Sequence, residues 1–271
     1  MMIDCHTHLT GLKTDEFERQ VRAAKSLGTA AFIEVVGKAE QAPRAVAMAN
    51  ARDDFYCGLA GHPMSVEAYD RGRDLPVFRR LIRDNKKVVC VGECGLDYWH
   101  QPTPPARVER QKELFRDMLR LAREFGLPLN LHAWRPGVED VLVMLREEKA
   151  YEVGGMIHQF GGNADQARQY MDMGFYVSVG VFIQHPRADR LRSVLKDIPL
   201  GQMVLDSDAP GARLERVGDS TEPYPYDMDK QCEARVLRYV CDKLAEVKGT
   251  PVDLVEAVTT HNARRLFRIT G

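Results

Sequence analysis

The chain opens with Met1-Met2-Ile3-Asp4-Cys5-His6-Thr7-His8, an apolar run that leads into two histidines separated by one residue. Further apolar runs follow along the chain, rich in Val, Ile, Phe and Leu, and most of them show no alternation with polar residues. Such runs are typical of strands buried on both faces of a parallel sheet. The sequence therefore predicts eight strands, over Met1–Cys5, Ala30–Val36, Phe55–Leu59, Val88–Gly92, Leu129–Leu131, Gly155–Ile157, Phe175–Val179 and Met203–Leu205.

Amphipathic segments separate these runs. The clearest is Arg107–Phe125, whose apolar residues recur at helical spacing and which ends at Gly126. Other helices are predicted over Asp15–Leu27, over Ala164–Met173 with Asn163 as its cap, and after Thr250-Pro251. Alternating strands and helices indicate a parallel α/β fold, and eight strands are the number of a barrel. We therefore expect residues 1–271 to form a single (β/α)8 TIM-barrel domain.

Composition narrows the class of protein. Hydrophobic residues make up 44% and charged residues 28% of the 271 residues, which is typical of a globular protein. No apolar run approaches the roughly 20 residues that a membrane span requires, and the first residues lack the features of a signal peptide. The six cysteines are scattered, which favours free thiols in a reducing compartment. We expect a cytoplasmic protein without a membrane partner.

Charge gives no global signal for nucleic acid, because 38 basic residues are balanced by 39 acidic ones. Residues able to bind metal nevertheless gather where the predicted strands end. They are His6, His8, Glu93, His132, His158 and Asp208. Alone, each would be read as a packed or capping residue. Because the carboxyl ends of barrel strands meet at one face, the joint pattern predicts a metal site there.

The residue types fit divalent cations. His6 and His8 are two positions apart on an extended strand, so both side chains point the same way and can bind one ion. Two ions roughly 3.5–4 Å apart need a bridging ligand, and a carboxylate can bridge where an imidazole cannot. Glu93 is therefore the expected bridge. Imidazole and carboxylate ligands suit Zn, Mg or Mn to different degrees, so the sequence leaves the identity of the two ions open.

Seven motifs, in order along nearly the whole chain, resemble the TatD family of metal-dependent deoxyribonucleases. They are Asp4-Cys5-His6-Thr7-His8, Gly61-His62-Pro63, Gly92-Glu93-Cys94-Gly95-Leu96-Asp97-Tyr98, Leu131-His132, His158-Gln159-Phe160-Gly161-Gly162, Asp206-Ser207-Asp208-Ala209-Pro210 and Asn262-Ala263-Arg264-Arg265-Leu266-Phe267. The resemblance implies a TIM-barrel phosphoesterase with two metal ions. It implies one ion bound by His6, His8, Glu93 and Asp208, and a second bound by Glu93, His132 and His158.

The sequence departs from the family pattern around the site. Met64 stands where the family often has a second His, and Ala133-Trp134 replaces a frequent Ser-Arg. Phe160-Gly161-Gly162 replaces Phe-Ser-Gly, and Thr221-Glu222-Pro223 replaces Asn-Glu-Pro. These departures leave the metal ligands intact and concern the substrate, not the hydrolysis.

Several further residues have both a functional and a structural interpretation. His62 either contacts a substrate phosphate or is structural, and Trp99 and Trp134 either stack on a base or pack against the protein. Arg213 and Arg216, in the long irregular stretch Ala209–Asp227, either contact phosphate or are solvated. Asp4 and Asp97 either orient metal-bound imidazoles or form ordinary salt bridges.

The leading hypothesis is a metal-dependent phosphodiesterase, a deoxyribonuclease that acts on DNA ends or other nucleic acid with a metal-activated water. Its catalytic residues would be Asp208, which accepts a proton or orients the water, Glu93 as the bridge, and His62 as a donor to a phosphate oxygen. One alternative is an esterase or deacylase on aminoacyl-RNA or another small substrate. Another is a non-catalytic barrel that binds a partner within a complex.

Overall fold

All eight apolar runs form parallel strands in the computed structural model, which describes residues 1–98, 103–134, 136–211 and 232–269. The strands are β1 Met2–Thr7, β2 Thr29–Val36, β3 Phe55–Leu59, β4 Val88–Leu96, β5 Leu129–Ala133, β6 Gly155–Ile157, β7 Phe175–Val179 and β8 Met203–Leu205. They hydrogen-bond in the order of the sequence, from β1 to β8. The predicted (β/α)8 class is confirmed.

The ring is nearly closed by the segment that follows β8. Thr7 pairs with Ala209 in a parallel bridge, and the His8 amide donates to the Ala209 carbonyl at 2.7 Å. The Asp208 amide likewise donates to the His6 carbonyl at 3.0 Å. These bonds join the end of β1 to the residues after β8, so the first and last metal-binding motifs lie side by side.

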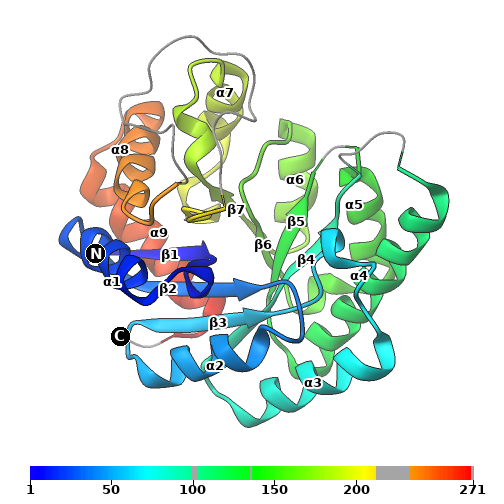
Figure 1. Cartoon of the computed structure of the whole chain (residues 1–271). Helices are drawn as coiled ribbons and strands as arrows, with labels where there is room; N and C mark the ends of the chain where they lie inside the picture. The colour runs from blue at the N-terminus through cyan, green and yellow to red at the C-terminus, as the bar shows by residue number, and fades with distance from the viewer. Residues whose placement is uncertain (99–102, 135, 212–231, 270–271) are drawn as a thin grey trace.

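Helices surround the strands, as Figure 1 shows. They are α1 Thr14–Ser26, α2 Ala42–Ala51, α3 Arg71–Asp84, α4 Pro105–Phe125, α5 Val138–Glu147, α6 Ala164–Asp172, α7 Asp189–Asp197, α8 Val236–Lys248 and α9 Val252–Phe267. The cap predicted for α6 is present as a capping box, in which Asn163 and Gln166 bond each other's backbone amides. No helix in the described part of the chain is long and apolar enough to cross a membrane.

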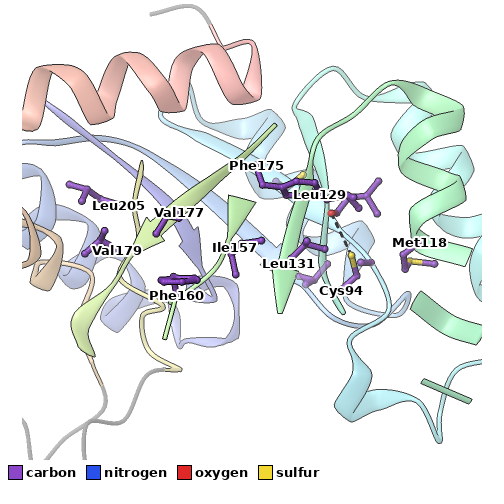
Figure 2. Close-up of a cluster of buried hydrophobic side chains, with 14 of the residues drawn as sticks. Cys94, Met118, Leu129, Leu131, Ile157, Phe160, Phe175, Val177, Val179 and Leu205 are labelled. Carbon is purple, nitrogen blue, oxygen red and sulfur yellow. Dashed lines mark hydrogen bonds between the residues drawn. The ribbon is translucent and has the colours of Figure 1, made fainter. Parts of the chain in front are cut away.

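The larger of two buried clusters lies between the strands and these helices. Figure 2 shows side chains of β5 to β8, such as Leu131 and Val177, packed in one buried cluster that also takes in Met118 of α4. A second cluster takes the alternating side chains on the other face of the strands, inside the barrel, and joins Ile3 of β1 and Ile33 of β2 to Phe267 of α9. All six cysteines are buried and free, as predicted. Neither cluster includes any of the six predicted metal ligands.

Three strands run further than the apolar pattern indicated. We expected His6, Glu93 and His132 to follow their strands, whereas each lies within one, in β1, β4 and β5. The apolar run stops at the first polar side chain, but the backbone hydrogen bonds continue past it. These three side chains are therefore fixed by strand backbone and not by loops.

Candidate metal centre

The six predicted metal ligands meet at one end of the barrel. Three overlapping groups have potential ligand atoms within 4.8 Å of one another. They are His6 with His8 and Glu93, His6 with His158 and Asp208, and His62 with Glu93 and His132. Residues from both ends of the sequence thus converge, as the strand-end argument predicted.

His6 and His8 point their Nε2 atoms at each other across 3.1 Å. The other ring nitrogen of each is held by the protein: His6 Nδ1 lies 2.9 Å from Asn130 Oδ1, and His8 Nδ1 lies 2.9 Å from the Val35 carbonyl oxygen. Because these oxygens accept hydrogen bonds from Nδ1, Nε2 is the ring atom that each histidine would offer to a metal. A partner of this kind is usual behind a metal-binding imidazole.

Glu93 lies at the centre of the cluster. Its Oε2 is 3.5 Å from Nε2 of both His6 and His8. Its Oε1 is 2.6 Å from His132 Nδ1 and 3.4 Å from His62 Nε2. The two carboxylate oxygens therefore face two different sets of imidazoles.

Carboxylates orient the other two ligand histidines. Asp97 Oδ2 lies 3.1 Å from His132 Nε2, which supports the orienting role considered for Asp97. Asp206 Oδ1 lies 3.5 Å from His158 Nδ1, while His158 Nε2 lies 3.6 Å from Asp208 Oδ2. The His158 ring also stacks on His6 at 3.5 Å between centroids, on the side of the cluster that contains Asp208.

The charges in this cluster depend on one another. Burial alone would lower the pKa of both His132 and His158, but the neighbouring carboxylates raise these values to about 9 and about 10. Burial alone would raise the pKa of Glu93, but the surrounding imidazoles hold it well below its usual range. For His6, burial and the nearby His158 lower the pKa.

The donor set fits divalent cations. Buried imidazoles gathered around Glu93 and Asp208 form the mixed nitrogen and oxygen environment that Zn and Mn accept. Positive charge inside the cluster would balance the carboxylates that face it. The residues present are therefore suited to hold the metal that the sequence pattern implied.

Asp208 has an unusual backbone for its position. Its φ of 53° lies in the left-handed region, which residues other than glycine adopt infrequently. This conformation turns its carboxylate back towards His8 and His158, with Oδ1 3.3 Å from His8 Nε2. Local strain of this type is concentrated at functional sites.

The structure places His62 and Trp134 at the centre and leaves Asp4 outside it. His62 fits beside the end of β2 because residue 37 is glycine: a Cβ there would lie 2.5 Å from His62 Cβ. The Trp134 ring lies 6.4 Å from His132 and contacts Phe182 edge-to-face at 5.6 Å. Asp4 instead accepts hydrogen bonds from the backbone amides of His6 and Ser207, so among the described residues it orients no imidazole. Trp99, Arg213 and Arg216 lie outside the described residues.

Three supporting residues escaped sequence reasoning. Asn130 lies inside an apolar strand, Asp206 stands two residues before the ligand Asp208, and Phe182 follows the strand β7 without a motif of its own. For Asn130 a usable signal existed, since an amide within a run buried on both faces needs a polar partner. The partners of the Asn130 amide are His6 Nδ1, which lies near its Oδ1, and the Cys5 carbonyl, which accepts from its Nδ2 at 3.0 Å.

Comparison with known proteins agrees with this geometry. The model of the family described as TatD related DNase matches residues 3–268. The metal-dependent hydrolase YabD of Bacillus subtilis is 33% identical, with 99% of this chain and all 100% of that protein aligned. The metal-dependent hydrolase YcfH of Escherichia coli K12 is 30% identical over 99% of this chain and 96% of its own length.

The fold is shared as well. The crystal structure of YjjV, a TatD homologue from Escherichia coli K12, superimposes with a TM-score of 0.85 at 26% identity and covers 99% of this chain and 98% of its own. Sequence, fold and the gathered ligand residues thus point the same way. The chain belongs to the TatD-related DNase family of metal-dependent hydrolases.

Proposed function

We propose that this protein is a two-metal phosphodiesterase that hydrolyses DNA, acting at strand ends. The observation that carries the proposal is the position of Glu93, whose Oε2 faces His6 and His8 while Oε1 faces His132. A carboxylate so placed suits a bridge between two ions. The family description as DNase supports DNA as the substrate.

Two sets of ligands would hold the metals. His6, His8, Glu93 Oε2 and Asp208 Oδ1 would form one, and Glu93 Oε1 with His132 the other. His158 lies beside His6 and Asp208, so its contacts alone would place it with the first set of ligands. The family resemblance instead implies that His158 pairs with His132 and Glu93 at the second ion, and that pairing stays a prediction. When bound, divalent ions lower the pKa of a coordinated water and stabilise charge on phosphate oxygens.

His62 is suited to donate a hydrogen bond, not to bind metal. The Met64 amide donates to His62 Nδ1 at 3.1 Å, which occupies that lone pair and puts the proton of the neutral ring on Nε2. Burial lowers the pKa of His62, so the ring is neutral at pH 7. Its Nε2–H points into the cluster, towards Glu93, where it would stabilise charge on a phosphate oxygen.

Asp208 and Trp134 would complete the reaction site. The pKa of Asp208 is held well below its usual range because His158 and His8 outweigh the effect of burial. An ionised Asp208 would orient the attacking water or accept its proton. Trp134 lies beside His132, and Phe182 packs against Trp134. Both rings are half-buried and offer aromatic surface on which a base would stack.

A direct attack by water is favoured over a covalent mechanism. Cys5 and Cys94 are buried, and burial raises the pKa of both thiols. They are therefore protonated at neutral pH and unsuited to act as nucleophiles.

The test is a panel of end-labelled substrates with equal metal supplied: single-stranded DNA, RNA of the same sequence and an aminoacyl-RNA ester. The proposal predicts that DNA is shortened from an end, and that Glu93→Ala abolishes this activity. Cleavage of the aminoacyl ester with intact DNA would instead support the esterase alternative. If none of the substrates is hydrolysed, the result would support the alternative in which the barrel is non-catalytic and binds a partner.

A further inference from the structure

We propose that Glu34, a residue of β2 outside the ligand set, is a positioning residue that fixes His8 for metal binding. This inference rests on the metal centre of the proposed function, but not on the identity of the substrate. Glu34 is completely buried, and its carboxylate faces the turn that carries His8.

Both Glu34 oxygens are filled by donors that flank His8. Oε2 accepts from Thr7 Oγ1 at 3.1 Å and from the Leu9 amide at 2.7 Å. Oε1 accepts from the Thr10 amide at 2.9 Å and from the Thr10 hydroxyl. The residue before His8 and the two residues after it are thus all tied to one carboxylate.

His8 needs this support because regular structure ends just before it. Strand β1 stops at Thr7, and His8 has φ −127° and ψ 38°, which belongs to neither helix nor strand. The Ala209 carbonyl holds the His8 amide at 2.7 Å, but His8 lies outside β1, so strand geometry does not set the direction of its side chain. β2 supplies the constraint twice, through Glu34 on the backbone and through the Val35 carbonyl on the imidazole Nδ1 at 2.9 Å.

Stability alone does not explain a carboxylate at this position. Its neighbours Ile33 and Val35 are buried and apolar, as expected for a strand covered on both faces. Burying an ionised carboxylate is costly unless hydrogen bonds compensate for lost water. Within the described residues no Lys or Arg forms an ion pair with Glu34, and the four donors of the His8 turn are its compensation.

The consequence concerns the geometry of the ligand atoms. His8 Nε2 must stay near His6 Nε2, at 3.1 Å, and near Asp208 Oδ1, at 3.3 Å, for one ion to contact all three residues. Loosening the turn would let the His8 ring move, whereas His6 would keep its position because it is fixed within β1. Removing groups that orient metal ligands typically weakens metal affinity by about 10- to 100-fold.

The experiment measures Zn²⁺ affinity of the metal-stripped full chain by competition with a chromophoric chelator, without substrate. Glu34→Gln keeps the shape but turns an amide N–H₂ towards two of the four donors. We expect its tighter Zn²⁺ site to weaken by at least about tenfold. Thr10→Val, which removes only one hydroxyl donor, should weaken it in the same direction but less.

Asp117→Asn is the matched control. Asp117 is a buried carboxylate of α4 that contacts Tyr69 and Arg71 and no ligand of the centre. The Asp117→Asn substitution should lower the melting temperature but leave the Zn²⁺ affinity unchanged. The proposal is overturned if Glu34→Gln, or Thr10→Val should Glu34→Gln fail to fold, keeps wild-type affinity. Since no substrate is present, a negative nuclease assay would not affect this outcome.

Discussion

Replacing Glu93 by glutamine tests the centre with a minimal change of shape. The carboxylate contacts imidazoles through both oxygens, at 3.5 Å to His6 and His8 and at 2.6 Å to His132. An amide has only one oxygen, and its N–H₂ must face the other set. In Glu93→Gln one set of ligands therefore loses its oxygen and the centre loses one negative charge.

The size of the effect follows from that loss. Removing an anionic ligand from a catalytic metal costs several kcal/mol of charge stabilisation. A loss of about 4 kcal/mol corresponds to a roughly thousand-fold fall in kcat/KM. Metal content should fall to at most one tightly held ion per chain. The fold should persist, because neither buried apolar cluster includes Glu93 or another ligand of the centre.

The assay combines steady-state hydrolysis of an end-labelled oligonucleotide with elemental analysis and circular dichroism. Asp117→Asn again serves as the control for loss of a buried carboxylate, because the contacts of Asp117 are with Tyr69 and Arg71 and not with the ligands. If Glu93→Gln retains kcat/KM within tenfold of wild type while folded, the role assigned to Glu93 is wrong.

Four other predictions follow from the site. Trp134→Leu and Phe182→Leu should each raise KM about 5- to 150-fold for a normal DNA terminus but not for an abasic one; equal KM changes for both substrates would return the rings to a packing role. His62→Ala should lower kcat about 100- to 1,000-fold with little change in KM, and an unchanged kcat would exclude it as a donor. Zn²⁺ binding at pH 7 should release protons and should tighten as pH rises, because pKa values of about 9 for His132 and about 10 for His158 mean that the metal must displace their protons. Calorimetry in buffers of different ionisation enthalpy would detect the released protons. Binding without proton release would contradict these pKa values. Hydrolysis of a chiral phosphorothioate in labelled water should invert configuration at phosphorus, whereas retention would require two displacements.

The barrel was predictable because its strands are buried on both faces and therefore appear as uninterrupted apolar runs. The ligands were predictable because parallel strands bring their carboxyl ends together. The positions of the strand ends were predicted less accurately, because the polar residue His6 ends the apolar pattern while β1 continues to Thr7. Hydrogen-bond ladders do not depend on side-chain polarity.

The supporting residues were harder to find for a different reason. Glu34 and Asn130 lie inside strands, where composition predicts packing, and their roles depend on donors and acceptors far away in the sequence. Asn130 reaches His6 across 124 residues, and Glu34 reaches Thr10 across 24. Sequence spacing alone gives no register between such strands. The three-dimensional contacts were needed to connect them with the metal centre.

The central claim is that Glu93 lies between two sets of ligands in one metal centre. Anomalous diffraction from crystals grown with Zn²⁺ or Mn²⁺ in excess would test it most directly. We predict up to two ions at the mouth of the barrel, with Glu93 bridging them when both are present and His6 and His8 binding one of them. Ions bound elsewhere, or a Glu93 carboxylate turned away from any ion at this site, would contradict the account.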